Sequence, residues 1–193
     1  MLTRFGPRIM PFEFDSPWKT LVVQNETSAD ISIVGIPFDG GTGGRIGTAE
    51  APFYLRELAR HKTLTTEDGT LLDKITLHDY GDVELGRSWE QFYENTKHLA
   101  TKALKHRFAL FLGGDHSVTI PLTAAFDDAI QTPWGLIQID AHPDLADIER
   151  GFKWSHACTA RRALELPGLS SSKLAFVGLR SFMSEEIKWL HDH

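Results

Sequence analysis

Residues 108–117 read FALFLGGDHS, and residues 134–144 read WGLIQIDAHPD. Each stretch opens with a short apolar run bounded by glycine, proline or charged residues, which predicts buried strands at 108–112 and 134–139. In each stretch the predicted strand is followed by a short motif that contains both histidine and aspartate. Because ligands bind at the carboxyl ends of strands in open α/β sheets, we expect these polar residues to share one crevice.

Strand and helix patterns alternate along the rest of the chain. Further strands are predicted at 31–36, 75–80 and 173–178, and helices at about 52–61, from 88 onward, and at about 118–129, 158–166 and 183–191. Gln91 follows Ser88 by three residues, which is the spacing of a capping box at a helix start. Repeated strand–helix units predict an α/β fold, a parallel sheet with helices on both faces. No repeat or linker divides the chain, so we expect a single domain over 1–193.

The composition and net charge of the chain exclude some classes of function. The chain has 193 residues, a formal net charge of -6 and one cysteine, Cys158. This charge offers no basic surface for nucleic acid, and no apolar run reaches membrane-spanning length. Residues 1–14 lack a signal-peptide pattern, so we expect a cytoplasmic protein that binds neither nucleic acid nor membrane. We interpret Cys158 as a buried small thiol.

Four side chains at the two strand ends form a candidate metal site. In an extended chain Asp140 and His142 point the same way, Asp144 lies beyond a proline that can turn the chain back, and His116 enters from a neighbouring loop. Mixed carboxylates and imidazoles without thiolates favour a hard divalent ion such as Mn²⁺ over structural Zn²⁺. The alternative is that the aspartates cap turns and the histidines belong to the core. Four such residues at two strand ends favour the metal site.

Two other motifs carry less weight. Residues 40–47 read GGTGGRIG between a strand and a helix, but Ile46 occupies a position where a dinucleotide-binding loop needs glycine. We therefore interpret this segment as a backbone turn. Asp115, His116 and Ser117 are adjacent in the sequence, which argues against a catalytic triad because triad members converge from separate segments.

The motifs resemble those of the ureohydrolase family, the arginases and agmatinases, and the resemblance runs through most of the chain from about residue 31. Similar segments are GIPFD at 35–39, RIG at 45–47, Ala51–Pro52, YGD at 80–82, WSH at 154–156 and VGLR at 177–180, with an agmatinase-like RFGP at 4–7. The resemblance implies the arginase-like three-layer fold and a Mn²⁺-dependent hydrolase of guanidino compounds.

Matched residue by residue, the resemblance also implies roles. His116, Asp140, His142 and Asp144 would bind two Mn²⁺ ions. Asp140 would bridge the ions, His116 and Asp144 would serve one of them, and His142 the other. His156 would be the catalytic, proton-handling histidine. The implied reaction is hydrolysis to an amine and urea, as in the conversion of agmatine to putrescine.

The sequence departs from the family pattern after the strand at 173–178. The family's further Asp-x-Asp motif does not follow there, and Ala157 stands where many members have glycine. The resemblance therefore implies a ureohydrolase-like domain that is incomplete at the C-terminus and, in isolation, poorly active. The alternative is a non-catalytic partner or regulatory subunit that retains half of the metal site. We expect a homo-oligomer or association with a complete paralogue, because a shortened sheet exposes an edge.

Overall fold

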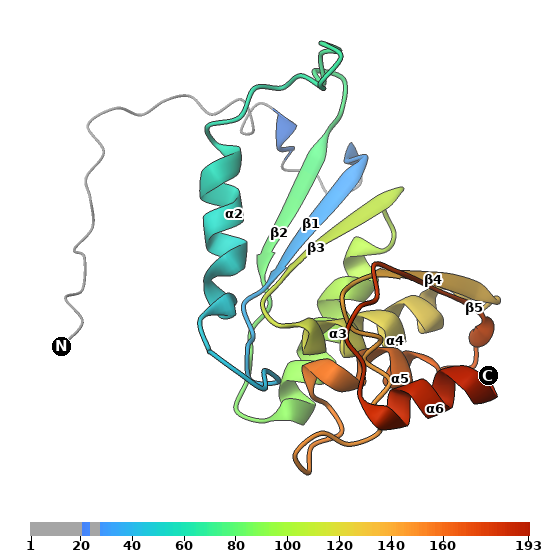
Figure 1. The fold of residues 1–193 in the computed structure, drawn as a ribbon. Coiled ribbons are helices and arrows are strands. Elements are labelled where there is room, and N and C mark those ends of the chain that lie inside the picture. Colours follow the sequence, from blue (N-terminus) through green and yellow to red (C-terminus); the bar gives the residue numbers. More distant parts are fainter. Residues whose placement is uncertain (1–20, 24–27) are drawn as a thin grey trace.

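The computed structural model describes residues 21–23 and 28–193, and the RFGP segment at 4–7 lies outside them. Strands and helices alternate as the sequence predicts (Figure 1). The strands are β1 (Ile31–Ile36), β2 (Leu77–Asp82), β3 (Phe108–Gly113), β4 (Trp134–Ile139) and β5 (Leu169–Val177). The α-helices are α2 (Ala51–Ala59), α3 (Trp89–Ala103), α4 (Thr119–Ile130), α5 (Thr159–Ala163) and α6 (Ser184–Asp192), with short 3-10 helices η2 (Thr48–Glu50), η3 (His116–Val118) and η4 (His156–Cys158).

All paired strands are parallel, which confirms the predicted sheet type. β1 lies between β2 and β3, with Ile31 opposite both Leu77 and Phe108. β4 pairs with β5, with Ile137 opposite Ala175. Within the described residues the strands form two sheets, β2-β1-β3 and β4-β5, so β3 and β4 each present an unpaired edge. The sequence predicted a single sheet. This division could not be read from the sequence, because strand patterns do not specify which strands pair.

Several predicted boundaries shift by one to four residues, among them those of β2, β5 and the helix predicted at 158–166. β2 begins at Leu77 rather than at 75, because Thr76 already binds the side chain of Asp30 through both its N–H and its hydroxyl. β5 begins at Leu169, four residues before its prediction, and pairs there with the start of β4. The helix predicted at 158–166 divides into η4 and the five-residue α5, which starts at Thr159.

The N-terminus of α3 is capped by a capping box in which one of the two hydrogen bonds differs from the usual pattern. The Ser88 hydroxyl accepts a hydrogen bond from the Gln91 N–H at 3.3 Å, as the capping box requires. The Gln91 side chain, however, accepts from the Arg87 N–H at 2.7 Å rather than from the N–H of the cap residue itself. The helix boundary was therefore predicted correctly, although the reciprocal hydrogen bond reaches one residue further back.

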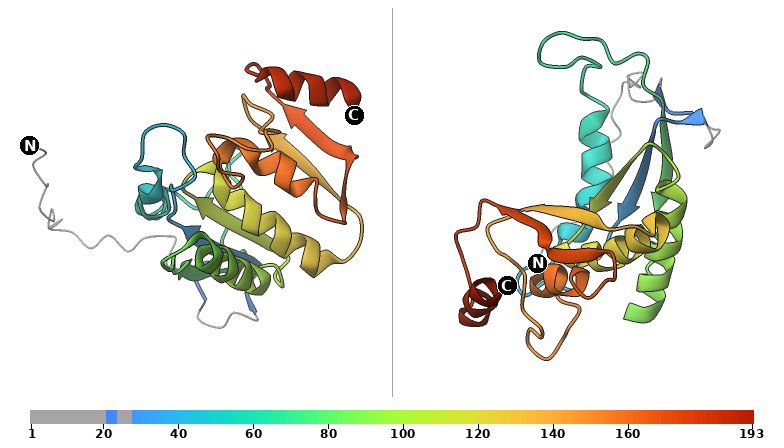
Figure 2. Two further views of the ribbon diagram at one scale, coloured as in Figure 1. Left: turned by 90° about the horizontal axis from the view of Figure 1, so that it is seen from below. Right: turned by 90° about the vertical axis from the view of Figure 1, so that its right-hand side faces the viewer.

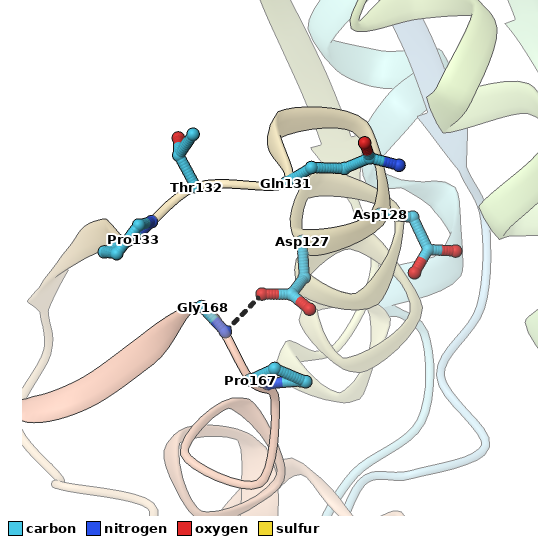
Figure 3. A pocket seen from close by; sticks show the side chains of 7 residues that line it. All are labelled: Asp127, Asp128, Gln131, Thr132, Pro133, Pro167 and Gly168. Atoms are coloured by element: carbon cyan, nitrogen blue, oxygen red, sulfur yellow. Dashed lines mark hydrogen bonds between the residues drawn. The ribbon is translucent and has the colours of Figure 1, made fainter.

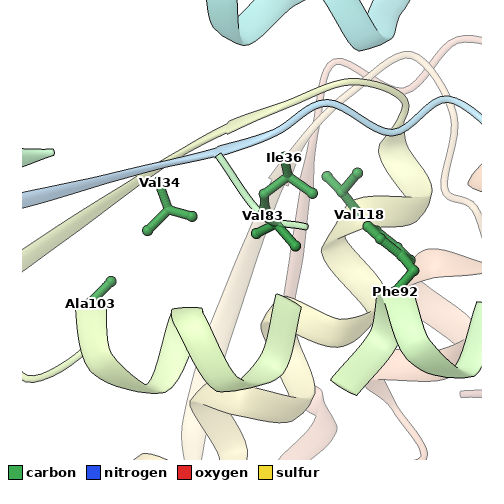
Figure 4. Packing of buried hydrophobic residues seen from close by; sticks show 6 residues of the cluster. All are labelled: Val34, Ile36, Val83, Phe92, Ala103 and Val118. Atoms are coloured by element: carbon green, nitrogen blue, oxygen red, sulfur yellow. The ribbon is translucent and has the colours of Figure 1, made fainter. Parts of the chain in front are cut away.

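β1 is buried on both faces. Val34 and Ile36 face α3, where they form a core with Phe92 and Ala103 (Figure 4). Ile33 faces the opposite side and packs with Leu77 of β2. Helix α2 lies on this second side, so the β2-β1-β3 sheet is enclosed between α2 and α3 (Figure 2). A central strand buried on both faces explains why its sequence is almost continuously apolar.

The β4-β5 sheet is covered on one face. Trp134 and Leu136 pack against α4 and α5 on that face. On the other face Ile137, Ile139 and Val177 are 69%, 80% and 51% exposed, and Ile139 and Val177 are register partners. An apolar sheet face next to an unpaired edge is a typical site of association.

We therefore expect the purified chain to self-associate. Light scattering should report a mass above that of one chain, because a second copy can cover the apolar face of β4 and β5. Ile137→Lys should reduce this mass by placing a charge on that face. Ile46→Lys is the matched control, since Ile46 is 75% exposed but lies in a loop away from the sheet. A monomeric wild-type chain would contradict the prediction.

Candidate functional site

Two strand ends carry the candidate ligands. His116 begins η3, three residues after the end of β3, and Asp140 follows directly after β4. Asp115 shapes the first turn by capping η3, with its Oδ1 accepting the Ser117 N–H at 2.8 Å. η3 and η4 are in contact, so the segment that contains His156 lies next to the segment that contains His116.

Three of the four predicted ligands converge. The His116 Nδ1 lies 2.7 Å from Asp144 Oδ2 and 3.8 Å from Asp140 Oδ2. Donor atoms of these three residues all lie within 4.8 Å of one another. One imidazole nitrogen with two carboxylates is a donor set suited to a divalent ion that prefers nitrogen and oxygen ligands. The geometry is therefore compatible with a metal at this position.

His142 lies beside this cluster rather than within it. Its side chain is 57% exposed, and its Nδ1 is 3.4 Å from Asp140 Oδ1, whereas His116 faces the other oxygen of that carboxylate, Oδ2. The His142 backbone N–H donates to Oδ1 at 2.9 Å. Asp140 thus stands between two imidazoles, with one carboxylate oxygen toward each of them.

The surroundings favour the ionised form of Asp140. Burial raises the pKa of its carboxyl group. The hydrogen bond from the His142 N–H and the nearby imidazoles of His116 and His142 together lower the pKa by more, so it lies below its ordinary value. Asp140 is therefore a carboxylate at neutral pH, the form required of a metal ligand.

Asp144 is held by a neighbour that the sequence analysis did not identify. Asp144 is buried and has a left-handed backbone with φ of 52°. The Gln138 Nε2 donates to its Oδ2 at 3.2 Å and to the His142 carbonyl oxygen at 3.0 Å. The available signal was a single amide side chain within the apolar run of β4. A polar residue there must find a partner, and Gln138 finds it in the loop that carries the candidate ligands Asp140, His142 and Asp144.

His156 lies on η4 and contacts the glycine-rich loop. Its Nδ1 is 2.9 Å from the Gly41 carbonyl oxygen and 3.5 Å from Glu149 Oε2. Thr159, three residues further on, places its hydroxyl 3.4 Å from His116 Nδ1. His156 therefore lies near the cluster of candidate ligands without belonging to it.

Aromatic stacking anchors the loop that precedes His156. The Trp154 ring stacks on Trp89 at the start of α3, with centroids 5.8 Å apart and an interplanar angle of 15°. Phe152 makes an edge contact with the same Trp89 ring at 5.8 Å. Cys158, two residues after His156, is fully buried, as the sequence predicts. These contacts fix the loop and with it the position of His156.

A surface cavity lies away from these residues. A space of about 480 Å³ opens between the end of α4 and the starts of β4 and β5 (Figure 3). Within it Asp127 accepts hydrogen bonds from the Gly168 N–H at 2.8 Å and from Trp134 Nε1 at 2.7 Å. This aspartate joins α4 to β5, and the cavity is at the amino ends of the strands. The residues that could carry out chemistry lie at the carboxyl ends of β3 and β4, so the candidate site is at that end of the strands.

Among the residues that the structure describes, no helix has the length and apolar character needed to cross a membrane.

The sequence matches proteins of one family. The profile of the arginase family matches residues 29–193. An agmatinase from Pyrococcus horikoshii is 31% identical over 198 residues, which cover 92% of this chain and 63% of the relative. A guanidinobutyrase from Pseudomonas aeruginosa is 32% identical over 174 residues, which cover 83% of this chain and 52% of the relative.

Solved structures share the fold. The agmatine ureohydrolase of Thermoplasma volcanium superimposes with a TM-score of 0.77 at 27% identity, covering 92% of this chain and 59% of that one. The formiminoglutamase of Trypanosoma cruzi, solved with Mn²⁺, gives a TM-score of 0.81 at 23% identity, covering 89% and 60%. The chain thus spans about half to two thirds of the length of these proteins. The profile match covers most of the sequence, and the strand ends carry the matching motifs: the chain belongs to the arginase family.

Proposed function

We propose that the protein hydrolyses a guanidino compound to an amine and urea in a manganese-dependent reaction, with agmatine as the leading substrate. The observation that carries the proposal is the convergence of His116, Asp140 and Asp144 next to His156, in a chain of the arginase family. Relatives named as an agmatinase and as a guanidinobutyrase support the substrate class. A cytoplasmic location stays a prediction.

The donor set supports a site for two ions. Asp140 directs Oδ2 toward His116 and Oδ1 toward His142, so its two oxygens can serve two ions. His116 and Asp144 would hold one ion, and His142 would contribute to the other. When bound, the ions would supply Lewis-acid activation of water and stabilise the negative charge that develops at the guanidino carbon.

His156 would handle the proton that the leaving amine requires. Its Nδ1 faces the Gly41 carbonyl oxygen and Glu149, whereas its Nε2 has no hydrogen-bond partner within the described part of the chain. An imidazole titrates near neutral pH, which suits proton transfer to an amine. Because Trp154 and Phe152 anchor the preceding loop, the ring is held in place before substrate arrives.

Urea release tests the proposal. The chain would be assayed with Mn²⁺ on agmatine, 4-guanidinobutyrate and arginine, alone and fused to the part of the Pyrococcus horikoshii agmatinase that it does not match. We expect little urea from the chain alone and clear Mn²⁺-dependent release from the fusion. Alanine at Asp140 or His142 should lower that release by about 100-fold or more, since even outer-shell partners of a metal site cost 10–100-fold.

Asp147→Ala is the matched control for this assay. Asp147 lies in the same loop but pairs with Arg162, outside the ligand cluster. Its replacement should leave urea release within about twofold of the unsubstituted fusion, because the Asp147 side chain is exposed and Arg162 keeps Glu165 as a second partner at 2.8 Å. No urea from the fusion on any of the three substrates would contradict the hydrolase and favour a non-catalytic partner. Strong Mn²⁺-dependent release by the chain alone would show that fewer ligands suffice.

A further inference from the structure

A continuous set of hydrogen bonds joins the ligand loop after β3 to His156. The carboxylate of Asp115, which is 8% exposed, accepts the Gly41 N–H at 2.8 Å through Oδ2. The carbonyl oxygen of the same Gly41 then accepts the His156 backbone N–H at 3.0 Å. It also lies 2.9 Å from the imidazole Nδ1 of His156. One glycine residue therefore connects the turn that carries His116 to the proposed proton-handling residue.

Only glycine fits at position 41. A Cβ there would collide with the Ser117 hydroxyl and would lie 2.5 Å from the Ser117 Cβ and 3.2 Å from Asp115 Oδ1. Distances this short require the loop to move away, because Ser117 is fully buried on η3. A Cβ added to Gly44, three residues further on, would meet no atom within 4 Å. The close approach of Gly41 to η3 is therefore a specific feature of this residue.

The surroundings of His156 Nδ1 favour a proton on that nitrogen. Two acceptors face it, the Gly41 carbonyl oxygen at 2.9 Å and Glu149 Oε2 at 3.5 Å. One donor also faces it, the Gly43 N–H at 3.2 Å, which could bind only to an unprotonated Nδ1. The carbonyl oxygen is closer than this donor, and the carboxylate of Glu149 adds attraction for a proton. A protonated Nδ1 leaves a lone pair on Nε2.

We propose that Asp115 and Gly41 are positioning residues that hold neutral His156 in its Nδ1–H tautomer. In this tautomer Nε2 is available to accept and return a proton, which is the task that the proposed hydrolysis assigns to His156. Asp115 acts through Gly41, because its carboxylate holds the N–H of the residue whose carbonyl oxygen accepts the imidazole proton. The hydrogen bond made by one ring nitrogen thus sets the state of the other.

The inference rests on the proposed function for its purpose, but its test does not require activity. The full chain would be labelled with ¹⁵N and studied without metal, above the pH at which its imidazoles titrate. Imidazole ¹⁵N shifts distinguish a protonated from an unprotonated ring nitrogen. The resonances of His156 would be assigned by their loss in His156→Gln. We expect the wild-type chain to show a protonated Nδ1 and an unprotonated Nε2.

Two variants break the connection at different points. Gly41→Ala should displace the carbonyl oxygen, and Asp115→Ala should release the Gly41 N–H. In each, the His156 signals should move toward the Nε2–H form, which an unconstrained imidazole favours. Gly44→Ala, in the same loop, should leave the wild-type pattern unchanged. Dispersion of the remaining spectrum shows whether each variant is folded, and Gly41→Ala decides the result if Asp115→Ala unfolds.

The outcomes separate this proposal from the proposed function. An Nε2–H signature in the wild-type chain, or an unchanged Nδ1–H signature in folded Gly41→Ala, would overturn the positioning role whatever the urea assay shows. The expected tautomer with no urea release from the fusion would retain the positioning role and overturn the hydrolase. Loss of the tautomer in Gly41→Ala together with lower urea release would support both.

Discussion

Asp144→Asn is expected to lower the affinity of the chain for Mn²⁺ by at least about 100-fold, because even outer-shell partners of metal sites typically cost 10–100-fold. Asp144 is buried and 2.7 Å from the His116 nitrogen, so its charge cannot be replaced by water without rearrangement. Asparagine is preferred to alanine here, since the left-handed φ of 52° is tolerated by asparagine. Calorimetric titration of Mn²⁺ into the metal-free chain measures the change.

The control for this titration is Asp147→Asn. Asp147 is three residues further along the same loop and binds Arg162 rather than the ligand cluster. Asp147→Asn removes the same charge from the chain as Asp144→Asn, so a difference in Mn²⁺ affinity between the two variants cannot come from net charge alone. Asp140→Ala should weaken binding in the same way as Asp144→Asn. Equal Mn²⁺ affinity in the wild-type chain and in Asp144→Asn would refute the ligand assignment.

Phe92→Ala is expected to reduce the free energy of unfolding by about 3–5 kcal/mol, the usual range for removing a buried phenylalanine. Phe92 is 1% exposed on α3 and stacks on Phe38 with ring centroids 4.0 Å apart. It belongs to the same buried cluster as Val34 and Ile36 of the central strand and lies beside Val118 in it (Figure 4). Urea denaturation followed by circular dichroism gives the change.

Phe53→Ala provides the comparison for this measurement. Phe53 lies on α2 and is 56% exposed, so the same atoms are removed from a side chain that buries little area. We expect its effect to stay within about 1 kcal/mol, as is usual for exposed positions. Similar losses in the two variants would contradict the assignment of Phe92 to the core between α3 and β1.

Features that depend on neighbouring residues in the chain were readable from the sequence. The apolar run at 31–36 forms β1 with the predicted limits, and the run at 134–139 does the same for β4. Ser88 caps α3 as its spacing to Gln91 indicates. These predictions succeed because side-chain periodicity and end-capping act over a few residues. The same local reasoning placed the two histidine–aspartate motifs at strand ends.

Features that depend on contacts between distant segments required the tertiary structure. The motifs contain four candidate ligands, but only the folded chain shows that His116, Asp140 and Asp144 converge while His142 lies beside them. Likewise, the glycine-rich loop reads as a turn, and nothing local indicates that Gly41 reaches both Asp115 and His156.

The apolar runs also do not indicate that the strands divide into the sheets β2-β1-β3 and β4-β5. Packing between segments far apart in the sequence determines which strands pair, where a side chain at a strand end points and how closely one loop approaches another. The hydrogen bond from the Gly41 N–H to Asp115 is an example. Periodicity carries no information about such distances, because it records only which residues face a core and not which core they share.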